Sequence, residues 1–212
     1  MWMNQAERHK ALDIFKFLTG QVELTDYEVA DPETLWHNLV QMHKGVLVTA
    51  IKPQQFVEFG SKGDGYDILI HARNRDDWDS GFRNWHPEHA EMVLRSFDNL
   101  EIASIGLPDM SFHVPGTVDL RGIPLSKLAD VMASSRVLVG PISGPIHFGA
   151  LCSIPTVTWA TKEEHGERVT FKWNPFDCQV EVIVGNDEIW KNRTPWTPRP
   201  REIIAKIRKV IT

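Results

Sequence analysis

Residues 140–147, Gly-Pro-Ile-Ser-Gly-Pro-Ile-His, combine residue types that bind an anion where a helix begins. The apolar run Val137–Val139 precedes them, and small apolar residues follow. Glycine lets backbone approach a ligand closely, Ser143 can donate its hydroxyl to a phosphate oxygen, and Pro145 suits a first helical turn. A helix that begins after a strand also offers free N–H groups and the positive end of its dipole. The segment therefore predicts a phosphate site, with His147 about one turn into the helix.

The same segment also fits a purely structural role. Ser143 is a favoured N-cap residue, and Pro145 stabilises a first helical turn without any ligand. Glycine and serine are common where a strand turns into a helix. The spacing alone therefore leaves the phosphate site and the helix cap equally open.

Arginines follow an earlier apolar run, Asp67–Ala72. Guanidinium groups bind phosphate oxygens in pairs, so these residues could neutralise a diphosphate. They are Arg73, Arg75 and Arg83. Ligands of a parallel sheet bind at the carboxyl ends of its strands, which places this segment at the same edge as Ser143. The alternative is a solvated loop where the arginines pair with neighbouring acids, Asp76, Asp77 and Asp79.

Two patterns raise the question of a metal. Asp77-Trp78-Asp79 has the Asp-x-Asp spacing that can hold a hard cation between phosphates, but three-residue matches arise by chance. His86 and His89 stand three apart where a helix begins, and no third ligand is apparent. We therefore expect neither a metal nor a resident cofactor.

Further contacts to a base or sugar are expected after the apolar run Ile154–Ala160. We predict a loop there, rich in groups that recognise a base, ribose or sugar hydroxyls: Glu163, Glu164, His165, Arg168 and Lys172. Asn174 follows in the same stretch. Trp159 or Trp173 could stack on a base, and both could equally belong to the core. A solvated loop without a ligand is the alternative.

Composition limits the class of protein. The chain has 212 residues, 42% hydrophobic and 24% charged, which is ordinary for a globular protein that buries its own core. A net charge of −5 gives no basic field for nucleic acid. No apolar stretch reaches the roughly 18 residues of a membrane span, and the N-terminus has no apolar signal core. Cys152 lies in an apolar run typical of a reduced core thiol, so we expect a cytoplasmic protein without a transmembrane segment.

Apolar runs alternate with helical patterns beyond residue 61. Strands are predicted at 67–72, 100–107, 117–122, 136–140, 154–160 and 178–184. Helices are predicted at 87–97, 124–135, 144–151 and 200–211. Such alternation implies right-handed βαβ units, so we predict an α/β protein with a Rossmann-like, doubly wound parallel sheet. There is no Walker loop, dinucleotide fingerprint or Gly-x-Ser-x-Gly elbow to support an NTPase, an NAD enzyme or a hydrolase.

The order of these motifs resembles one family. Residues 119–159, from Asp-Leu-Arg-Gly through Ser-Gly-Pro-Ile-His to Thr-Val-Thr-Trp, resemble the C-terminal half of the lipopolysaccharide heptosyltransferases, glycosyltransferase family 9. Upstream, Arg83 and Trp85 stand for an Arg/Lys-Trp pair of that family, with His86 inserted before the proline. The resemblance covers roughly residues 66–184. At Ile142 the family usually has Asp, so a carboxylate is missing from the expected donor site.

This resemblance implies a GT-B fold, of which residues 61–212 form the nucleotide-sugar-binding half. It implies an inverting, metal-free transfer of a hexose or heptose from a nucleotide-diphosphate sugar to a hydroxyl on a glycan or lipid-linked acceptor. Ser143, Gly144 and their helix would stabilise the leaving diphosphate. Arg73 or Arg75 would add positive charge, and His147 would orient the phosphate or sugar.

The N-terminal region departs from that family. Residues 1–60 are predicted to form a short, mainly helical region or the remnant of an acceptor domain. The family has a complete domain at this position, which carries its catalytic Asp. The chain is therefore expected to be either part of a longer protein or a minimal relative. His71 is the candidate catalytic base within the chain. Otherwise a missing domain or a partner chain would supply the base. The alternatives to an enzyme are a non-catalytic module that binds a nucleotide or nucleotide sugar, and a subunit that docks on a complete transferase.

Overall fold

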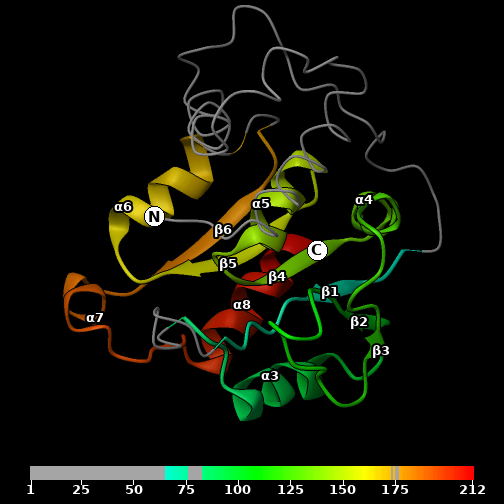
Figure 1. Cartoon of the computed structure of the whole chain (residues 1–212), viewed down its shortest axis with the longest axis horizontal. Helices are drawn as coiled ribbons and strands as arrows, with labels where there is room; N and C mark the ends of the chain where they lie inside the picture. The colour runs from blue at the N-terminus through cyan, green and yellow to red at the C-terminus, as the bar shows by residue number, and fades with distance from the viewer. Residues whose placement is uncertain (1–64, 76–82, 173, 175–176) are drawn as a thin grey trace, which may run out of the picture. The chain divides into compact units, whose positions relative to one another are not determined.

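A six-stranded parallel sheet forms the centre of the fold, in the order β3-β2-β1-β4-β5-β6 (Figure 1). The computed structural model describes residues 65–75, 83–172, 174 and 177–212, all in one compact unit. Predictions for residues 1–60 and for Asp76–Asp79 lie outside these residues. The strands are β1 (Ile68–Ile70), β2 (Ile102–Ser104), β3 (Val118–Asp119), β4 (Val137–Pro141), β5 (Thr156–Ala160) and β6 (Val180–Val184). The predicted doubly wound α/β class is confirmed.

Each strand lies within or overlaps its predicted range, because the interior strands are apolar on both faces. β1, β2, β4 and β5 are buried at every residue, as expected for parallel strands covered on both sides by helices. β3 is the exposed edge strand and has only two residues. The apolar runs therefore predicted the strands well but overestimated the length of most of them.

Helices cover both faces of the sheet. α3 (Pro87–Leu94), its 3-10 turn η1 (Arg95–Phe97) and α8 (Pro200–Ile211) lie on one face. α4 (Leu125–Ser134), α5 (Gly144–Leu151) and α6 (Glu163–Glu167) lie on the other (Figure 1). These bounds confirm the helices predicted from Pro87, at 124–135, at 144–151 and at 200–211. Within the described part of the chain, no helix has the length and apolarity to cross a bilayer.

The predicted loop after β5 is wrong. The chain there forms α6 and then the π-helical turn η2 (Arg168–Lys172). Tertiary packing explains the difference, since a Cβ on Gly166 would touch Val182 and Val184 of β6 at 3.3 Å. Such a short helix depends on its packing rather than on propensity. A further helix that the sequence analysis did not predict, α7 (Asp187–Asn192), is capped by Asn186.

The main core lies between the sheet and the α3–α8 layer. Side chains from alternate positions of the central strands point into it, including Ile70, Val139 and Trp159. α8 contributes Ile203 and Ile207, one turn apart and fully buried. Cys152 is a buried free thiol, as predicted, and burial raises its pKa to about 12.

Candidate functional site

The site lies at the topological switch point of the sheet. β1 and β4 are neighbours, and the chain leaves them for opposite halves of the sheet. Ligands of doubly wound sheets bind at the carboxyl ends of the strands at such a point. Ile70 pairs with Val139, and the His71 backbone N–H donates to the Val139 carbonyl at 2.8 Å. The segments after β1 and β4 therefore lie side by side, as the sequence analysis expected.

Ser143 begins α5 without capping it. It holds the N-cap position, but its hydroxyl donates to the Pro141 carbonyl at 2.9 Å and makes no bond to the first turn. The first turn closes when the His147 N–H donates to the Ser143 carbonyl at 3.1 Å. Among the described residues, nothing lies within 4 Å of a Cβ built on Gly144. The Ser143 hydroxyl therefore does not cap α5, and the first-turn N–H groups are available to an anion.

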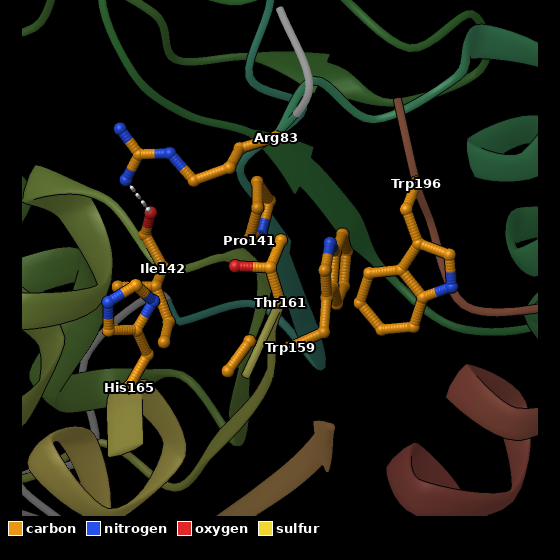
Figure 2. A pocket seen from close by; sticks show the side chains of 8 residues that line it. Arg83, Pro141, Ile142, Trp159, Thr161, His165 and Trp196 are labelled. Carbon is orange, nitrogen blue, oxygen red and sulfur yellow. Dashed lines mark hydrogen bonds between the residues drawn. The ribbon is translucent and has the colours of Figure 1, made fainter. Parts of the chain in front are cut away.

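A small pocket opens beside this N-terminus (Figure 2). It holds about 290 Å³, including space open to solvent. Its lining residues are Arg83, Pro141, Ile142, Trp159, Ala160, Thr161, His165 and Trp196. Figure 2 shows Thr161 in the middle of these residues, with Ile142 and His165 on one side of it and the two tryptophans, Trp159 and Trp196, on the other. The enclosed space is small, so a whole nucleotide does not fit inside the pocket.

The end of β5 contributes to the pocket wall two buried polar groups that make no hydrogen bond to a described residue. They are the Thr161 hydroxyl and the Trp159 indole N–H, on side chains that are 4% and 3% exposed. Most buried polar groups in proteins are paired, and an unpaired one costs about 1–3 kcal/mol. These groups are therefore candidates for contact with a ligand.

Arg83 reaches the pocket from the opposite side. Its Nη1 donates to the Ile142 carbonyl at 3.4 Å, which holds the guanidinium over the end of β4 (Figure 2). Of the three arginines predicted to bind phosphate, Arg83 is the one in the pocket lining. Its position beside the α5 N-terminus suits neutralisation of an anion.

Arg73 and Arg75 are held by Asn84 instead. Arg73 Nη1 donates to Asn84 Oδ1 at 2.8 Å, and the Arg75 backbone N–H donates to the same oxygen at 3.0 Å. Asn84 Nδ2 returns a bond to the Arg75 carbonyl at 3.0 Å. Arg73 is only 4% exposed, so its visible role is to tie the segment after β1 to Asn84, the residue that follows Arg83.

His71 is poorly placed for the role of catalytic base. It is 4% exposed, and its Nδ1 lies 3.3 Å from the Ile105 carbonyl oxygen. Burial, more than the nearby Arg73 charge, lowers its pKa to about 4. A general base needs access to its substrate and a pKa near the working pH. Both properties argue against His71.

His165 stands at the edge of the pocket on α6. Its ring packs edge-on against Trp190 with centroids 4.5 Å apart. Partial burial, followed by the charges of Lys162 and Arg168, lowers its pKa to about 4. The imidazole is therefore neutral at neutral pH, because burial and the neighbouring cations both disfavour its charged form.

The other predicted contacts to a base or sugar divide into three groups. Trp159 both lines the pocket and belongs to the core, where it packs edge-on against Trp85 with centroids 4.9 Å apart. Arg168 forms an ion pair with Glu164 on the surface. The Lys172 side chain and Trp173 lie outside the described residues.

Asn174, which follows in the same stretch, is structural. It is 6% exposed, and its amide donates to the Thr170 and Cys178 carbonyls at 3.2 and 2.8 Å. It also accepts from the Cys178 N–H at 3.0 Å. These bonds close the turn that leads into β6.

Sequence reasoning missed part of the pocket. The motifs do not single out Thr161, and they predict a loop rather than a helix around His165. The end of β5 at the ligand edge was an available signal for both residues. Trp196 comes from the α7–α8 connection, far away in sequence, and nothing local indicated it.

Possible metal ligands do not gather in the described residues. No group of three His, Cys, Asp or Glu side chains lies close enough together there to hold an ion. The His86 and His89 rings are tilted neighbours with centroids 5.6 Å apart. The Asp77–Asp79 pair lies outside the residues that the structure describes.

Comparison with solved structures identifies the fold. A glycosyl transferase family 9 protein from Veillonella parvula DSM 2008 matches 84% of this chain with a TM-score of 0.52 and 14% identity. The chain is similar in fold to a family 9 glycosyltransferase. The E. coli ADP-heptose lps heptosyltransferase II also matches, with a TM-score of 0.49 and 13% identity over 71% of this chain. No protein-family model and no curated sequence matches the chain.

The extent of the match matters for function. The chain spans about half of each solved structure, 51% of the first and 47% of the second. At this identity the likeness shows the fold, which confirms the resemblance that the motifs predicted. What the whole protein binds or transfers is a matter for proposal.

Proposed function

We propose that this chain is the donor-binding half of a glycosyltransferase that uses a nucleotide-diphosphate sugar. The carrying observation is the uncapped α5 N-terminus at the switch point, with Arg83 and a pocket containing unpaired donors beside it. Helix N-termini bind phosphates, and ligands of doubly wound sheets bind at such a switch point. The family 9 fold supports the same assignment.

In this proposal the protein stabilises the leaving group electrostatically. The first-turn N–H groups of α5 and the Arg83 guanidinium face negative charge as it develops on the departing diphosphate. Ser143 can turn its hydroxyl from the Pro141 carbonyl to a phosphate oxygen, and His147 lies one turn further along. Transfer with inversion to a glycan or lipid-linked hydroxyl then needs no metal or other cofactor. The proposed location is the cytoplasm, because Cys152 and Cys178 are both free thiols.

A non-catalytic nucleotide or nucleotide-sugar binding module is the second candidate. One observation favours it: the described pocket is lined by no carboxylate, and His71 is a buried, weak base. Transfer to a hydroxyl requires a base that accepts its proton. In the enzyme reading, residues outside the described pocket would supply that base.

The test is a thermal-shift and calorimetric panel of ADP, UDP, GDP, dTDP and CDP, with NAD as the comparison. A ligand of the folded state raises the melting temperature by mass action. We expect one diphosphate to bind saturably to the wild type. Ser143→Asp should abolish that binding, because it places a carboxylate where the phosphate would lie.

Ser96→Asp is the matched control, because it adds the same charge on η1 after α3 and should bind normally. If no nucleotide binds, the donor-binding proposal is wrong. If one binds but the matching nucleotide sugar never releases its diphosphate with or without acceptors, the binding module is the better description.

A further inference from the structure

The described lining of the pocket beside Ser143 consists of hydrogen-bond donors, an arginine and apolar groups, and it includes no carboxylate. Among its described lining residues, Arg83 and the Trp159 indole are obligate donors, and Thr161 offers a hydroxyl. The Thr161 and Trp159 groups are both buried and unpaired within the described chain. A group that only accepts hydrogen bonds and carries negative charge complements this set.

His165 is the group at this pocket that can respond to such a charge. Lys162 at the α6 N-cap, Arg168 in η2 and Arg83 before α3 all disfavour its protonation. Glu164 opposes them but is itself held by Lys162 at 2.7 Å and by Arg168. From α7 the ring meets the neutral Trp190, over which Lys162 also lies.

We propose that this pocket binds an oxyanion, either a phosphate or a carboxylate of the donor substrate, and that His165 takes up a proton from solvent when the anion binds. The reason is electrostatic, since a negative charge beside the imidazole stabilises its charged form and offsets the surrounding cations. Proton uptake and anion binding then strengthen each other by linkage. This proposal depends on the proposed function in one respect, namely that the anion is part of a donor substrate.

The adjacency of the two anion positions supports the link to the donor. Ile142 lines the pocket, and the next residue, Ser143, begins α5. If one phosphate of a donor lies at the helix N-terminus, the group bonded to that phosphate would therefore lie at the pocket. That neighbour is either the second phosphate or an acidic group on the transferred sugar.

The experiment is an NMR titration of the histidine imidazole signals with and without inorganic pyrophosphate, at matched ionic strength in chloride. We expect the pKa of His165 to rise from about 4 toward 6.5 when pyrophosphate binds. His113 is not in the pocket lining, and its Nε2 lies 2.9 Å from the Thr117 carbonyl oxygen; its ring signals serve as the internal control and should be the same with and without pyrophosphate. Glucuronate and glucose replace pyrophosphate in parallel samples. A response to glucuronate alone assigns the pocket to a sugar carboxylate, and a response to pyrophosphate assigns it to phosphate.

Two isosteric variants separate binding from structure. Thr161→Val removes the pocket hydroxyl. It should lower the affinity for the anion by about tenfold or more, the usual effect of losing a hydrogen bond to a charged group. Thr158→Val is the matched control, because Thr158 is equally buried and unpaired but is not in the pocket lining. It should leave binding unchanged.

An unchanged His165 titration with every anion would overturn the proposal, as would equal binding by Thr161→Val and wild type. These outcomes are separate from the fate of the donor function. A nucleotide diphosphate could still bind at α5 without moving His165. Conversely, a His165 response to pyrophosphate with no nucleotide binding would leave the oxyanion pocket standing and remove the donor function.

Discussion

Two glycines near the ligand edge have opposite surroundings. Gly140 is the last but one residue of β4, and a Cβ there would lie 2.7 Å from the His71 carbonyl oxygen. Gly144 opens α5, and no described residue lies within 4 Å of a Cβ built there. The first glycine is needed for strand packing, whereas the described residues leave room for a side chain at the second.

We expect Gly140→Ala to lower the free energy of unfolding by about 2 kcal/mol, because backbone on the neighbouring strand cannot yield easily. Gly144→Ala should leave stability unchanged or raise it by less than about 1 kcal/mol, since alanine favours a helix. Under the proposed function, Gly144→Ala should nevertheless weaken the binding of the nucleotide diphosphate, because the added methyl group would lie where the phosphate is proposed to bind. Urea unfolding and calorimetry measure both effects, and a stable Gly140→Ala or a fully binding Gly144→Ala would contradict this account.

The helices differ in how their N-termini are satisfied. At α7 the Asn186 side chain accepts from the Ile189 N–H at 3.1 Å, which is an ordinary cap. At α5 the Ser143 hydroxyl turns back to Pro141. A helix whose cap residue does not cap leaves its first-turn donors for a ligand or solvent.

This contrast predicts different costs for two alanine substitutions. Asn186→Ala should destabilise the protein by about 1 kcal/mol, the usual value of a lost cap. Ser143→Ala should cost less than about half of that, while weakening diphosphate binding. Urea unfolding of both variants makes the comparison. An equal loss of stability in the two variants would show that Ser143 is a structural cap after all.

At the scale of the whole molecule, the switch point contains a buried, neutral histidine. His71 follows β1, contacts the Ile105 carbonyl after β2, and lies against Gly140 of β4. Burial lowers its pKa to about 4, whereas an unfolded chain has the ordinary value of 6.5. The unfolded state therefore binds a proton first as the pH falls.

The stability from His71 is fully present above pH 6.5 and is lost as the pH falls toward 4. We expect a loss on the order of 2 kcal/mol across this interval, with a smaller one in the same direction from the partly exposed His165. Urea unfolding at several pH values measures it. His71→Gln should flatten the dependence, and an unchanged slope in that variant would assign the acid sensitivity to other groups.

Local sequence was sufficient for most of the architecture. Apolar runs such as Val137–Val139 predict buried strands, and Pro87 and Pro200 mark helix starts, because these signals act within a few residues. Alternation of the two elements determined the parallel, doubly wound class, and Gly140–Pro145 determined where a ligand edge would lie. The family resemblance came from the same stretch.

Only the tertiary structure decided which of the marked residues meet. The strand order brings Arg83, His165 and Trp196 to one pocket from three distant segments, and pairing across a sheet is not encoded within any of them. Packing on β6 turned an expected loop into α6, and Asn84 drew Arg73 away from the pocket. Side-chain partners depend on contacts between distant residues, so composition and spacing could name candidate residues but not show which of them meet.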